Sequence, residues 1–378
     1  MEVHPQKSRR SIVMLTHEFF PQHGGIAVYT EEMARAAVRL GHDVEVWAPE
    51  HDALRAKAKN YPFKIKTLEL KGSQGWPCRI ALARAILAEK DTLKHKTLYL
   101  PEPGPIASCM YLQLLTKIPC KDLIVTLHGS EILTFTALTY RTALFKKLLK
   151  QAARVSAVSH FSKNLLESRI PSMKGKLAIT PGTLRHDFES VSPRRESKET
   201  IHILTVGRIH PRKGQLATVE ALSKLEPYLK SRIEYSIVGP TVDRPYKRAI
   251  ERLAKRSSLS VKFTNSVDKS QLKHLYASAD IFALTSMPYK KSVEGYGLVY
   301  LEAGAFGLPS IAHDIGGVAE ALEDKKTGLL ASPYDRMSLT QAFKQVIQSQ
   351  KLRETLGNNA ELKAHKYTWD DRAKVLFS

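Results

Sequence analysis

Residues 11–48 read SIVMLTHEFFPQHGGIAVYTEEMARAAVRLGHDVEVWA, and this stretch says more about the architecture than any other. It begins with an apolar run, SIVMLT, that is typical of a buried parallel strand. A loop with Gly24 and Gly25 follows, and apolar residues then recur at helical spacing over 26–40. The helix is predicted to end at a glycine, and DVEVWA at 43–48 predicts a second strand. The whole stretch therefore predicts a βαβ unit with a glycine-rich turn after its first strand.

The alternation of strands and helices continues along the chain in two series. In the first, further strands are predicted at 97–100, 123–127, 154–158 and 177–180, and Ser159 is predicted to cap a helix at about 160–168. In the second, strands are predicted at 201–206, 235–238, 261–264, 281–285 and, as the last one, 310–313. Helices are predicted at 215–225, 245–256 and 269–278, and mainly helical sequence follows to Ser378. Two such series predict two doubly wound, Rossmann-like α/β domains.

The domain boundaries follow from this pattern and from a length of 378 residues, which exceeds one ordinary core. Residues 1–182 are predicted to form an N-terminal domain, the polar stretch 183–200 a linker, and 201–360 a C-terminal domain. A last helix within 361–378 is expected to pack back on the N-terminal domain. Ligands of such sheets bind outside the carboxyl ends of the strands, so two facing domains would place the site in the cleft between them.

The net charge is +21, and the excess is spread evenly, at +11 over residues 1–190 and +10 over 191–378. Charge at this level favours anionic partners, namely phosphorylated substrates, anionic lipid or nucleic acid, without choosing among them. No apolar run approaches the roughly 18–20 residues that span a bilayer, and the apolar stretch near the N-terminus predicts a strand rather than a signal peptide. The cysteines form no CxxC pair and fit a reduced, cytoplasmic compartment: Cys78, Cys109 and Cys120.

The segment Glu294-Gly-Tyr-Gly-Leu-Val-Tyr-Leu-Glu302 carries the most specific chemistry. Gly295 and Gly297 permit close backbone approaches, and the apolar run from Leu298 predicts a helix with Glu302 about one turn inside it. A loop carboxylate and a first-turn carboxylate beside free backbone N–H groups suit a polyhydroxy ligand that also carries phosphate. The plainer alternative is an exposed pair at a helix start.

Basic residues follow the first strand of the second series, in Gly207-Arg-Ile-His-Pro-Arg-Lys-Gly214. A loop at a helix N-terminus offers N–H donors to phosphate. Arg208 and Lys213 add a guanidinium fork and an ammonium group for a diphosphate. The plainer alternative is a solvated basic loop.

Three further motifs stand at predicted strand ends. Gly24 and Gly25 precede a helix, where they allow close approach of a ligand or form a plain tight turn. They do not fit GxGxxG, which argues against a nicotinamide or flavin. His128, in LHGSE, faces the predicted cleft or acts as a structural cap, and Gly316-Gly-Val-Ala-Glu320 contacts an anion or forms a simple left-handed turn.

In this order, the motifs resemble one family closely, the retaining glycosyltransferases of family 4, which have the GT-B fold of two facing Rossmann-like domains. The resemblance covers about residues 11–375 and is specific for the family, but says little about the acceptor. It is carried by HEFFPQHGG (17–25), LHGSE (127–131), SAVSHFSKNLL (156–166), VGRIHPRKG (206–214), EGYGLVYLE (294–302) and GGVAE (316–320).

The resemblance implies transfer of a hexose-type sugar from a UDP- or GDP-sugar to a hydroxyl acceptor bound by the N-terminal domain. Gly24 and Gly25 would close on the donor phosphates and the acceptor. His128 would contact the donor sugar near its 6-hydroxyl and the reacting centre. Arg208 and Lys213 would clamp the diphosphate and stabilise the leaving group.

The resemblance also assigns the Glu294–Glu302 segment to the donor. Glu294 would hold a sugar hydroxyl and Glu302 the ribose hydroxyls, with Gly295, Tyr296, Gly297 and Leu298 beside the donor. Phe263 and Thr264 would contact the nucleobase. Tyr296 replaces the Phe of the family's common E-x-F-G. Lys290 and Lys291, in the loop before it, are unusual: they would favour an acidic donor sugar or an anionic acceptor, or simply be solvated.

Family members of this type need no bound metal, because cationic side chains neutralise the diphosphate, and no metal site is predicted. No carboxylate is clearly placed as a nucleophile on the opposite face of the sugar. This favours a front-face retaining route, in which the leaving phosphate helps to deprotonate the acceptor.

The acceptor stays open. Residues 141–154 predict a basic amphipathic helix that either lies on an anionic membrane, at its inner face and near a lipid-linked acceptor, or is an ordinary domain helix. The resemblance fits polysaccharide or glycolipid assembly. The alternatives are a non-hydrolysing sugar-nucleotide epimerase on the same fold, an inactive family member and a nucleic-acid-binding protein. Dispersed charge without a recognition module argues against the last, so no nucleic acid is expected as a partner.

Overall fold

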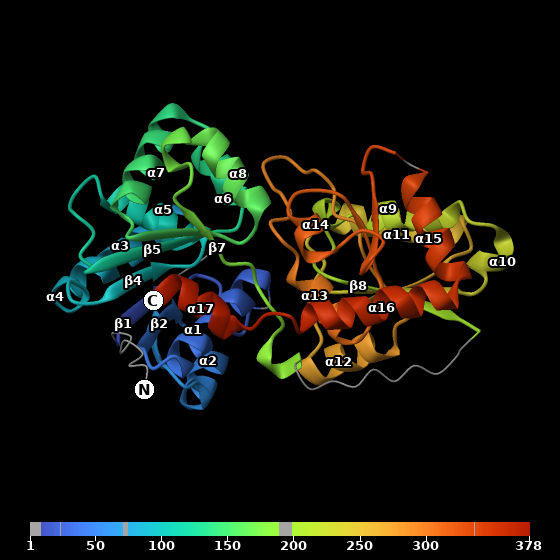
Figure 1. The fold of residues 1–378 in the computed structure, drawn as a ribbon, viewed down its shortest axis with the longest axis horizontal. Helices are drawn as coiled ribbons and strands as arrows, with labels where there is room; N and C mark the ends of the chain where they lie inside the picture. The colour runs from blue at the N-terminus through green and yellow to red at the C-terminus, as the bar shows by residue number, and fades with distance from the viewer. Residues whose placement is uncertain (1–8, 23, 71–74, 189–198, 336) are drawn as a thin grey trace, which may run out of the picture. The chain divides into compact units, whose positions relative to one another are not determined.

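The computed structural model describes residues 9–22, 24–70, 75–188, 199–335 and 337–378. The chain forms two compact units, of which the first comprises residues up to Gly182 together with Thr368–Ser378, and the second Thr183–Tyr367. Each unit is a parallel sheet with helices on both faces (Figure 1). The predicted class, two doubly wound Rossmann-like α/β folds, is confirmed.

The sheet of the first unit has the strand order β3-β2-β1-β4-β5-β6-β7, and all its neighbouring strands are parallel. The order reverses between β1 and β4, so their carboxyl ends form a switch point, the usual ligand position in such a sheet. Within the described residues the strands are β1 (Ser11–Leu15), β2 (Asp43–Pro49), β3 (Lys64–Leu68), β4 (Thr97–Leu100), β5 (Asp122–Leu127), β6 (Arg154–Ala157) and β7 (Leu177–Ile179).

Helices cover both faces of this sheet, and α17 at the end of the chain packs against α1. Ser159 caps α8 as predicted, because its hydroxyl accepts a hydrogen bond of 3.1 Å from the Ser162 amide. The helices of this unit are α1 (Gly25–Arg39), α2 (Asp52–Lys57), α3 (Trp76–Ala88), α4 (Lys90–Leu93), α5 (Pro103–Leu112), α6 (Ser130–Phe135), α7 (Thr139–Gln151), α8 (His160–Arg169) and α17 (Trp369–Phe377), with short 3₁₀ turns at Ala58–Asn60 and Pro171–Met173.

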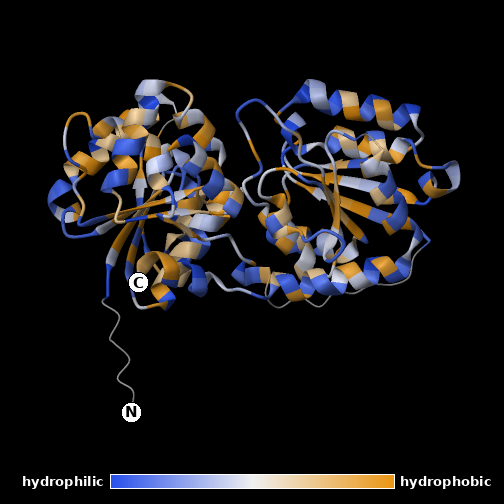
Figure 2. Ribbon diagram, turned by 45° about the horizontal axis from the view of Figure 1, so that its top comes forward, coloured by the Kyte–Doolittle hydropathy of each residue, from blue (hydrophilic) through white to orange (hydrophobic). Residues whose placement is uncertain are grey.

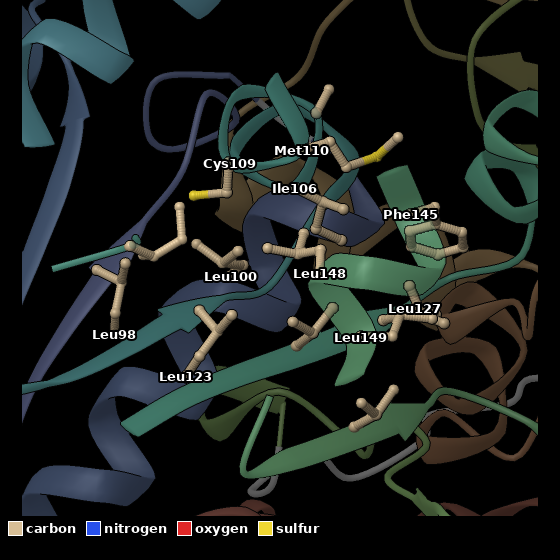
Figure 3. Close-up of a cluster of buried hydrophobic side chains, with 14 of the residues drawn as sticks. Leu98, Leu100, Ile106, Cys109, Met110, Leu123, Leu127, Phe145, Leu148 and Leu149 are labelled. Carbon is tan, nitrogen blue, oxygen red and sulfur yellow. The ribbon is translucent and has the colours of Figure 1, made fainter. Parts of the chain in front are cut away.

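The basic helix predicted at 141–154 is α7, and its apolar side belongs to the core of the first unit. Phe145, Leu148 and Leu149 are buried there among residues of β4, β5 and α5 (Figure 3). Burial of such side chains is worth roughly 1.5–3 kcal/mol each. The apolar side of α7 is therefore already covered, which supports the interpretation as an ordinary domain helix.

The sheet of the second unit has the order β10-β9-β8-β11-β12-β13, again with parallel neighbours. Its switch point lies between β8 and β11. Apolar residues line the strands of both units (Figure 2), as expected for sheets that are covered on both faces. The described strands are β8 (Ile201–Val206), β9 (Ile233–Val238), β10 (Ser260–Thr264), β11 (Ile281–Leu284), β12 (Ser310–His313) and β13 (Gly328–Ala331).

Two groups of helices cover the faces of this second sheet, with α9 and α11 on one and α12, α13 and α16 on the other (Figure 1). The described helices are α9 (Gln215–Ser223), α10 (Pro227–Lys230), α11 (Arg244–Arg256), α12 (Lys269–Ser278), α13 (Leu298–Ala305), α14 (Val318–Ala321), α15 (Ser338–Gln348) and α16 (Gln350–Ala364), with 3₁₀ turns at His186–Phe188 and Pro211–Lys213.

Three predicted boundaries were wrong. The strand at 310–313 is not the last, because β13 follows it after α14 and pairs with it in parallel. β13 is only four residues long and has no β-branched side chain to signal a strand. Residues 183–188 of the predicted linker belong to the second unit, where Phe188 is fully buried, and 189–198 lie outside the described residues. Residues 361–367 also belong to that unit, because α16 runs to Ala364.

Among the described helices, none combines the length and the apolar character needed to cross a bilayer. The three cysteines are free thiols, and Cys78 and Cys109 are buried. Burial raises the pKa of the Cys120 thiol to about 11, so it is protonated at neutral pH.

Candidate active site

The best-developed site of the second unit lies at its switch point. β8 and β11 are neighbours in the sheet, and the loops that follow them start at the same edge. The first loop ends in the 3₁₀ turn Pro211–Lys213, and the second leads through Glu294 into α13. The sheet order thus brings together two motifs that are about 80 residues apart in the sequence.

Glu294 is the centre of this site. Its Oε2 atom accepts hydrogen bonds from the Lys213 ammonium at 2.8 Å, the Arg212 guanidinium at 2.9 Å and the Ser286 hydroxyl at 3.0 Å. The three charged side chains are largely buried. All three contacts fall on Oε2, so within the described residues Oε1 remains able to accept a hydrogen bond from a ligand.

The charges of this cluster depend on one another. Burial alone would raise the pKa of the Glu294 carboxyl, but Lys213 and then Arg212 hold that pKa at about 2. Burial lowers the pKa of the Lys213 ammonium, and the Glu294 carboxylate opposes this shift. The carboxylate is therefore ionised at neutral pH and is a strong acceptor for a hydroxyl group.

Two glycines allow the loops to approach this closely. Gly214 has a φ of 71°, and a Cβ there would lie 1.7 Å from the Thr285 carbonyl oxygen. Gly316 has a φ of 62°, and a Cβ there would lie 2.2 Å from the Glu294 carbonyl oxygen. The Gly317 amide donates to that same oxygen at 2.9 Å. The Gly316-Gly317 motif thus supports the backbone of Glu294, and its predicted anion contact stays a prediction.

Arg208 and Lys213 line a hollow with a volume of about 320 Å³, together with Arg212. Arg208 is exposed, and its carbonyl oxygen is held by the Gln215 side chain at 2.9 Å. His210 also lines the hollow. Its imidazole accepts a hydrogen bond from the Arg212 amide at 3.1 Å, and burial followed by Arg208 lowers its pKa. The structure brings the predicted diphosphate clamp together; its role in binding stays a prediction.

Glu302 lies in α13 as predicted, and its partners differ from those of Glu294. It accepts a 3.0 Å hydrogen bond from the Tyr276 hydroxyl, and the Arg185 guanidinium lies 3.7 Å away. Burial raises the pKa of the Glu302 carboxyl, while Arg185 opposes the shift. Neither pairing was predicted, because Arg185 was assigned to the linker and Tyr276 is a buried helix residue. The ribose contact of Glu302 stays a prediction.

The remaining residues of this unit that were predicted to contact the sugar donor lie on the same loop or at a strand end. Gly297 caps α13 with a φ of 98°, Leu298 begins that helix and Tyr296 packs on the core. Gly295 lies between Glu294 and Tyr296, in the loop. The last residues of β10 are Phe263, which the Lys247 ammonium covers at 4.9 Å from the ring centroid, and Thr264, whose carbonyl accepts from the Gly239 amide at 2.9 Å.

In the first unit, His128 follows β5, and its ring packs edge-on against Tyr29. Its Nε2 atom lies 2.7 Å from the Pro101 carbonyl oxygen. A carbonyl only accepts, so Nε2 donates and Nδ1 of the neutral ring is the acceptor. Gly24 and Gly25 form the exposed start of α1, whose first amides have no side-chain cap.

Sequence reasoning missed several residues. Arg212 could have been noticed only because it precedes Lys213, and Ser286 only because it follows the end of β11. Glu102 was also missed. It is a fully buried carboxylate just after β4, at the switch point of the first unit. Its Oε1 atom lies 3.3 Å from His17 Nδ1 and 3.3 Å from the Thr16 hydroxyl. His17 was quoted only as part of a motif.

The cluster predicts a pH-dependent contribution to stability. The pKa of Glu294 in the folded chain, about 2, lies below its ordinary value of 4.5, so the ionised carboxylate stabilises the fold above pH 4.5 and less as the pH falls towards 2. Glu294→Gln should lower the free energy of unfolding at pH 7 by about 1–3 kcal/mol. This deficit should shrink between pH 5 and 3.5 in urea titrations.

The matched control is Glu251→Gln, which removes a half-exposed carboxylate of an i,i+4 pair and should change little at any pH. A deficit of Glu294→Gln that stays constant from pH 7 to 3.5 would contradict the ionised cluster.

Comparisons with known proteins bear on the family of the chain. Residues 23–187 match the model of Glycosyltransferase Family 4, and residues 187–363 match that of Glycosyl transferases group 1. A related protein is the GDP-mannose-dependent alpha-(1-6)-phosphatidylinositol monomannoside mannosyltransferase of Mycolicibacterium smegmatis. It is 25% identical over 354 residues, which cover 88% of this chain and 87% of that protein.

Solved structures share the fold. A glycosyltransferase from Rickettsia africae has a TM-score of 0.77 at 18% identity, covering 97% of this chain and 96% of that one. Anabaena HepE in complex with UDP and glucose has a TM-score of 0.75 at 17% identity, covering 97% and 98%. With both halves matched by family models, and with two Rossmann-like parallel sheets, the chain belongs to the family 4 glycosyltransferases of the GT-B fold.

Proposed function

We propose that this glycosyltransferase moves a hexose-type sugar from a UDP- or GDP-sugar to a hydroxyl acceptor, with retention of the anomeric configuration. The observation that carries the proposal is the Glu294 carboxylate between Lys213 and Arg212. Its Oε2 atom is used by the protein, and its Oε1 atom is available to a sugar hydroxyl. One carboxylate oxygen thus orients the sugar beside the cations that would hold the diphosphate.

The nature of the donor is supported by related proteins. The mycobacterial relative is named for its use of GDP-mannose, and the HepE structure contains UDP and glucose. Glu302 would hold the ribose hydroxyls, and Phe263 and Thr264 would lie at the base.

The charges suit the cleavage of a sugar–phosphate bond. When the bond breaks, negative charge develops on the diphosphate, and Lys213 and Arg208 would stabilise it. Amides at the start of α13 would add donors. A phosphate oxygen of the leaving group would take the proton of the acceptor hydroxyl, which then attacks from the same face. Side-chain cations would do the work that a metal does elsewhere, so we expect no metal requirement.

Lys213→Ala tests the leaving-group clamp. We expect kcat to fall by about 10²–10³-fold, because a preplaced charge is lost from the transition state. The fold should persist, since Arg212 and Ser286 still satisfy the Glu294 carboxylate. Steady-state kinetics with the active donor measure kcat, and circular dichroism shows whether the variant is folded. Turnover close to that of the wild type in a folded Lys213→Ala would remove Lys213 from this role.

The reaction itself is tested with a panel of UDP- and GDP-sugars and polyol acceptors. Proton NMR of the product should show the anomeric configuration of the donor, and EDTA should leave the rate unchanged. An inverted product would refute the retaining route. A sugar nucleotide that is converted to its epimer without any acceptor would identify the epimerase instead.

We further propose that the acceptor is lipid-linked and that the first unit binds an anionic bilayer, through a surface other than α7. Trp76, at the start of α3, is 53% accessible. Leu114 and Leu115 are exposed in the turn that follows the adjacent helix α5, and Leu115 is 84% accessible. The Arg79 guanidinium lies 5.3 Å from the Trp76 ring centroid, and Lys117 is exposed nearby in the chain. Aromatic, aliphatic and basic groups together suit the headgroup region of anionic lipid. The relative's name includes a phosphatidylinositol mannoside.

Co-sedimentation with vesicles of phosphatidylglycerol and phosphatidylcholine tests this surface. Trp76→Ala combined with Leu115→Ser should reduce the bound fraction at least about threefold, because apolar area at the headgroups is lost. The control is Tyr334→Ser with Met337→Ser, which removes exposed apolar groups from the second unit and should bind like the wild type. Equal binding of both variants and the wild type would exclude this surface.

A further inference from the structure

The two lysines before Glu294 occupy a defined turn. Tyr289 and Ser292 form an antiparallel bridge, and the Ser292 amide donates to the Tyr289 carbonyl at 3.0 Å. Lys290 and Lys291 are the two central residues of this turn, and Lys290 has a φ of 49°. The side chains of both lysines are exposed. A tight turn of this kind fixes where the two side chains leave the backbone.

Two contacts hold the turn beside the diphosphate clamp. The Met287 amide donates to the Arg212 carbonyl at 2.9 Å. The Tyr289 ring packs edge-on against the His210 imidazole, with centroids 4.9 Å apart. Since His210 is fixed in turn by the Arg212 amide, the lysine turn and the Pro211–Lys213 turn form one structure.

These contacts bring five cationic side chains to one hollow of about 320 Å³: Arg208, Arg212, Lys213, Lys290 and Lys291. Two carboxylates lie nearby. Glu294 pairs with Arg212 and Lys213. Asp243 caps α11, and its charge opposes the lowering of the His210 pKa. In the part of the chain that the structure describes, neither Lys290 nor Lys291 has a carboxylate partner. Among the described residues, the cations of the hollow without a carboxylate partner are therefore Lys290, Lys291 and Arg208.

A count of charges shows that one diphosphate does not balance the hollow. Five cations and two carboxylates leave three positive charges. The two phosphoryl groups of a sugar nucleotide are diesters and carry one negative charge each. At least one positive charge therefore remains for another anion. Glu294 engages only Arg212 and Lys213, and Arg208 is assigned to the diphosphate, so the remaining charge falls to the lysines.

We propose that Lys290 and Lys291 bind a second anionic group of the substrate, a carboxylate or a phosphate, in addition to the donor diphosphate. This inference rests on the proposed function. The group would be carried either by the transferred sugar or by the acceptor, since both would approach the hollow beside Glu294. Exposed ammonium groups recognise such an anion as point charges without strict geometry, so both sources fit the same pair of lysines.

The test compares two variants that remove equal charge from the second unit. In the first, Lys290→Gln is combined with Lys291→Gln. In the control, Lys255→Gln is combined with Lys351→Gln, two exposed lysines of α11 and α16 that do not line the hollow. Dissociation constants are measured by calorimetry for UDP, GDP, UDP-glucose, UDP-glucuronic acid, inositol and inositol 1-phosphate.

The wild type should bind one anionic probe more tightly than its neutral counterpart, and the lysine variant should bind that probe at least about 10-fold more weakly. Loss for UDP-glucuronic acid but not UDP-glucose places the anion on the donor sugar. Loss for inositol 1-phosphate but not inositol places it on the acceptor. UDP and GDP should bind within about threefold of the wild type, and the control should match the wild type for every probe.

Three results would overturn the inference. The first is a lysine variant that behaves like the control with every anionic probe. The second is an equal loss for UDP and GDP, which would make the lysines part of the diphosphate clamp. The third is a wild type without preference for either anionic probe. If the wild type bound no nucleotide at all, the proposed function would fail as well, so the two failures are distinguishable.

Discussion

A buried carboxylate that must stay ionised organises the second unit. Glu294 is stable in its position only because Lys213, Arg212 and Ser286 contact it, since an unpaired buried charge costs several kcal/mol. These contacts with Glu294 hold the loops after β8 and β11 against each other. The close approach of the loops also explains the glycines at 214 and 316, where a side chain would collide with the backbone of the facing loop. The side chains of this cluster are thus held in place by the protein itself, which would lower the entropy lost if a ligand binds there.

Much of this could be predicted from the sequence. Apolar runs alternate with helical patterns over both halves, and sheets buried on both faces require such runs, so the fold class followed. The loops with Arg208, Lys213 and Glu294 were also found, because glycines and charged residues at strand ends are local signals. The start of α13 at Leu298 was predicted for the same reason.

What could not be predicted depends on contacts between distant segments. The sequence does not show that Arg212 faces Glu294, because that pairing follows from the order of β8 and β11 in the sheet. Glu302 with Tyr276, and His17 with Glu102, are of the same kind. β13 was missed because Gly328–Ala331 lacks strand-forming side chains and pairs only because β12 offers an edge. The opening residues of the linker were misjudged because one buried ring, Phe188, outweighs several polar neighbours.

The return of α17 to the first unit has a consequence for biosynthesis. Trp369 is buried and packs edge-on against Tyr29 of α1, and Phe377 is buried against Tyr99 of β4. A ribosome therefore releases all of the second unit before the first receives its final helix, and domains tend to fold as units during synthesis. The half that begins the chain is the last to be completed, and until then the α1 surface that α17 covers faces solvent.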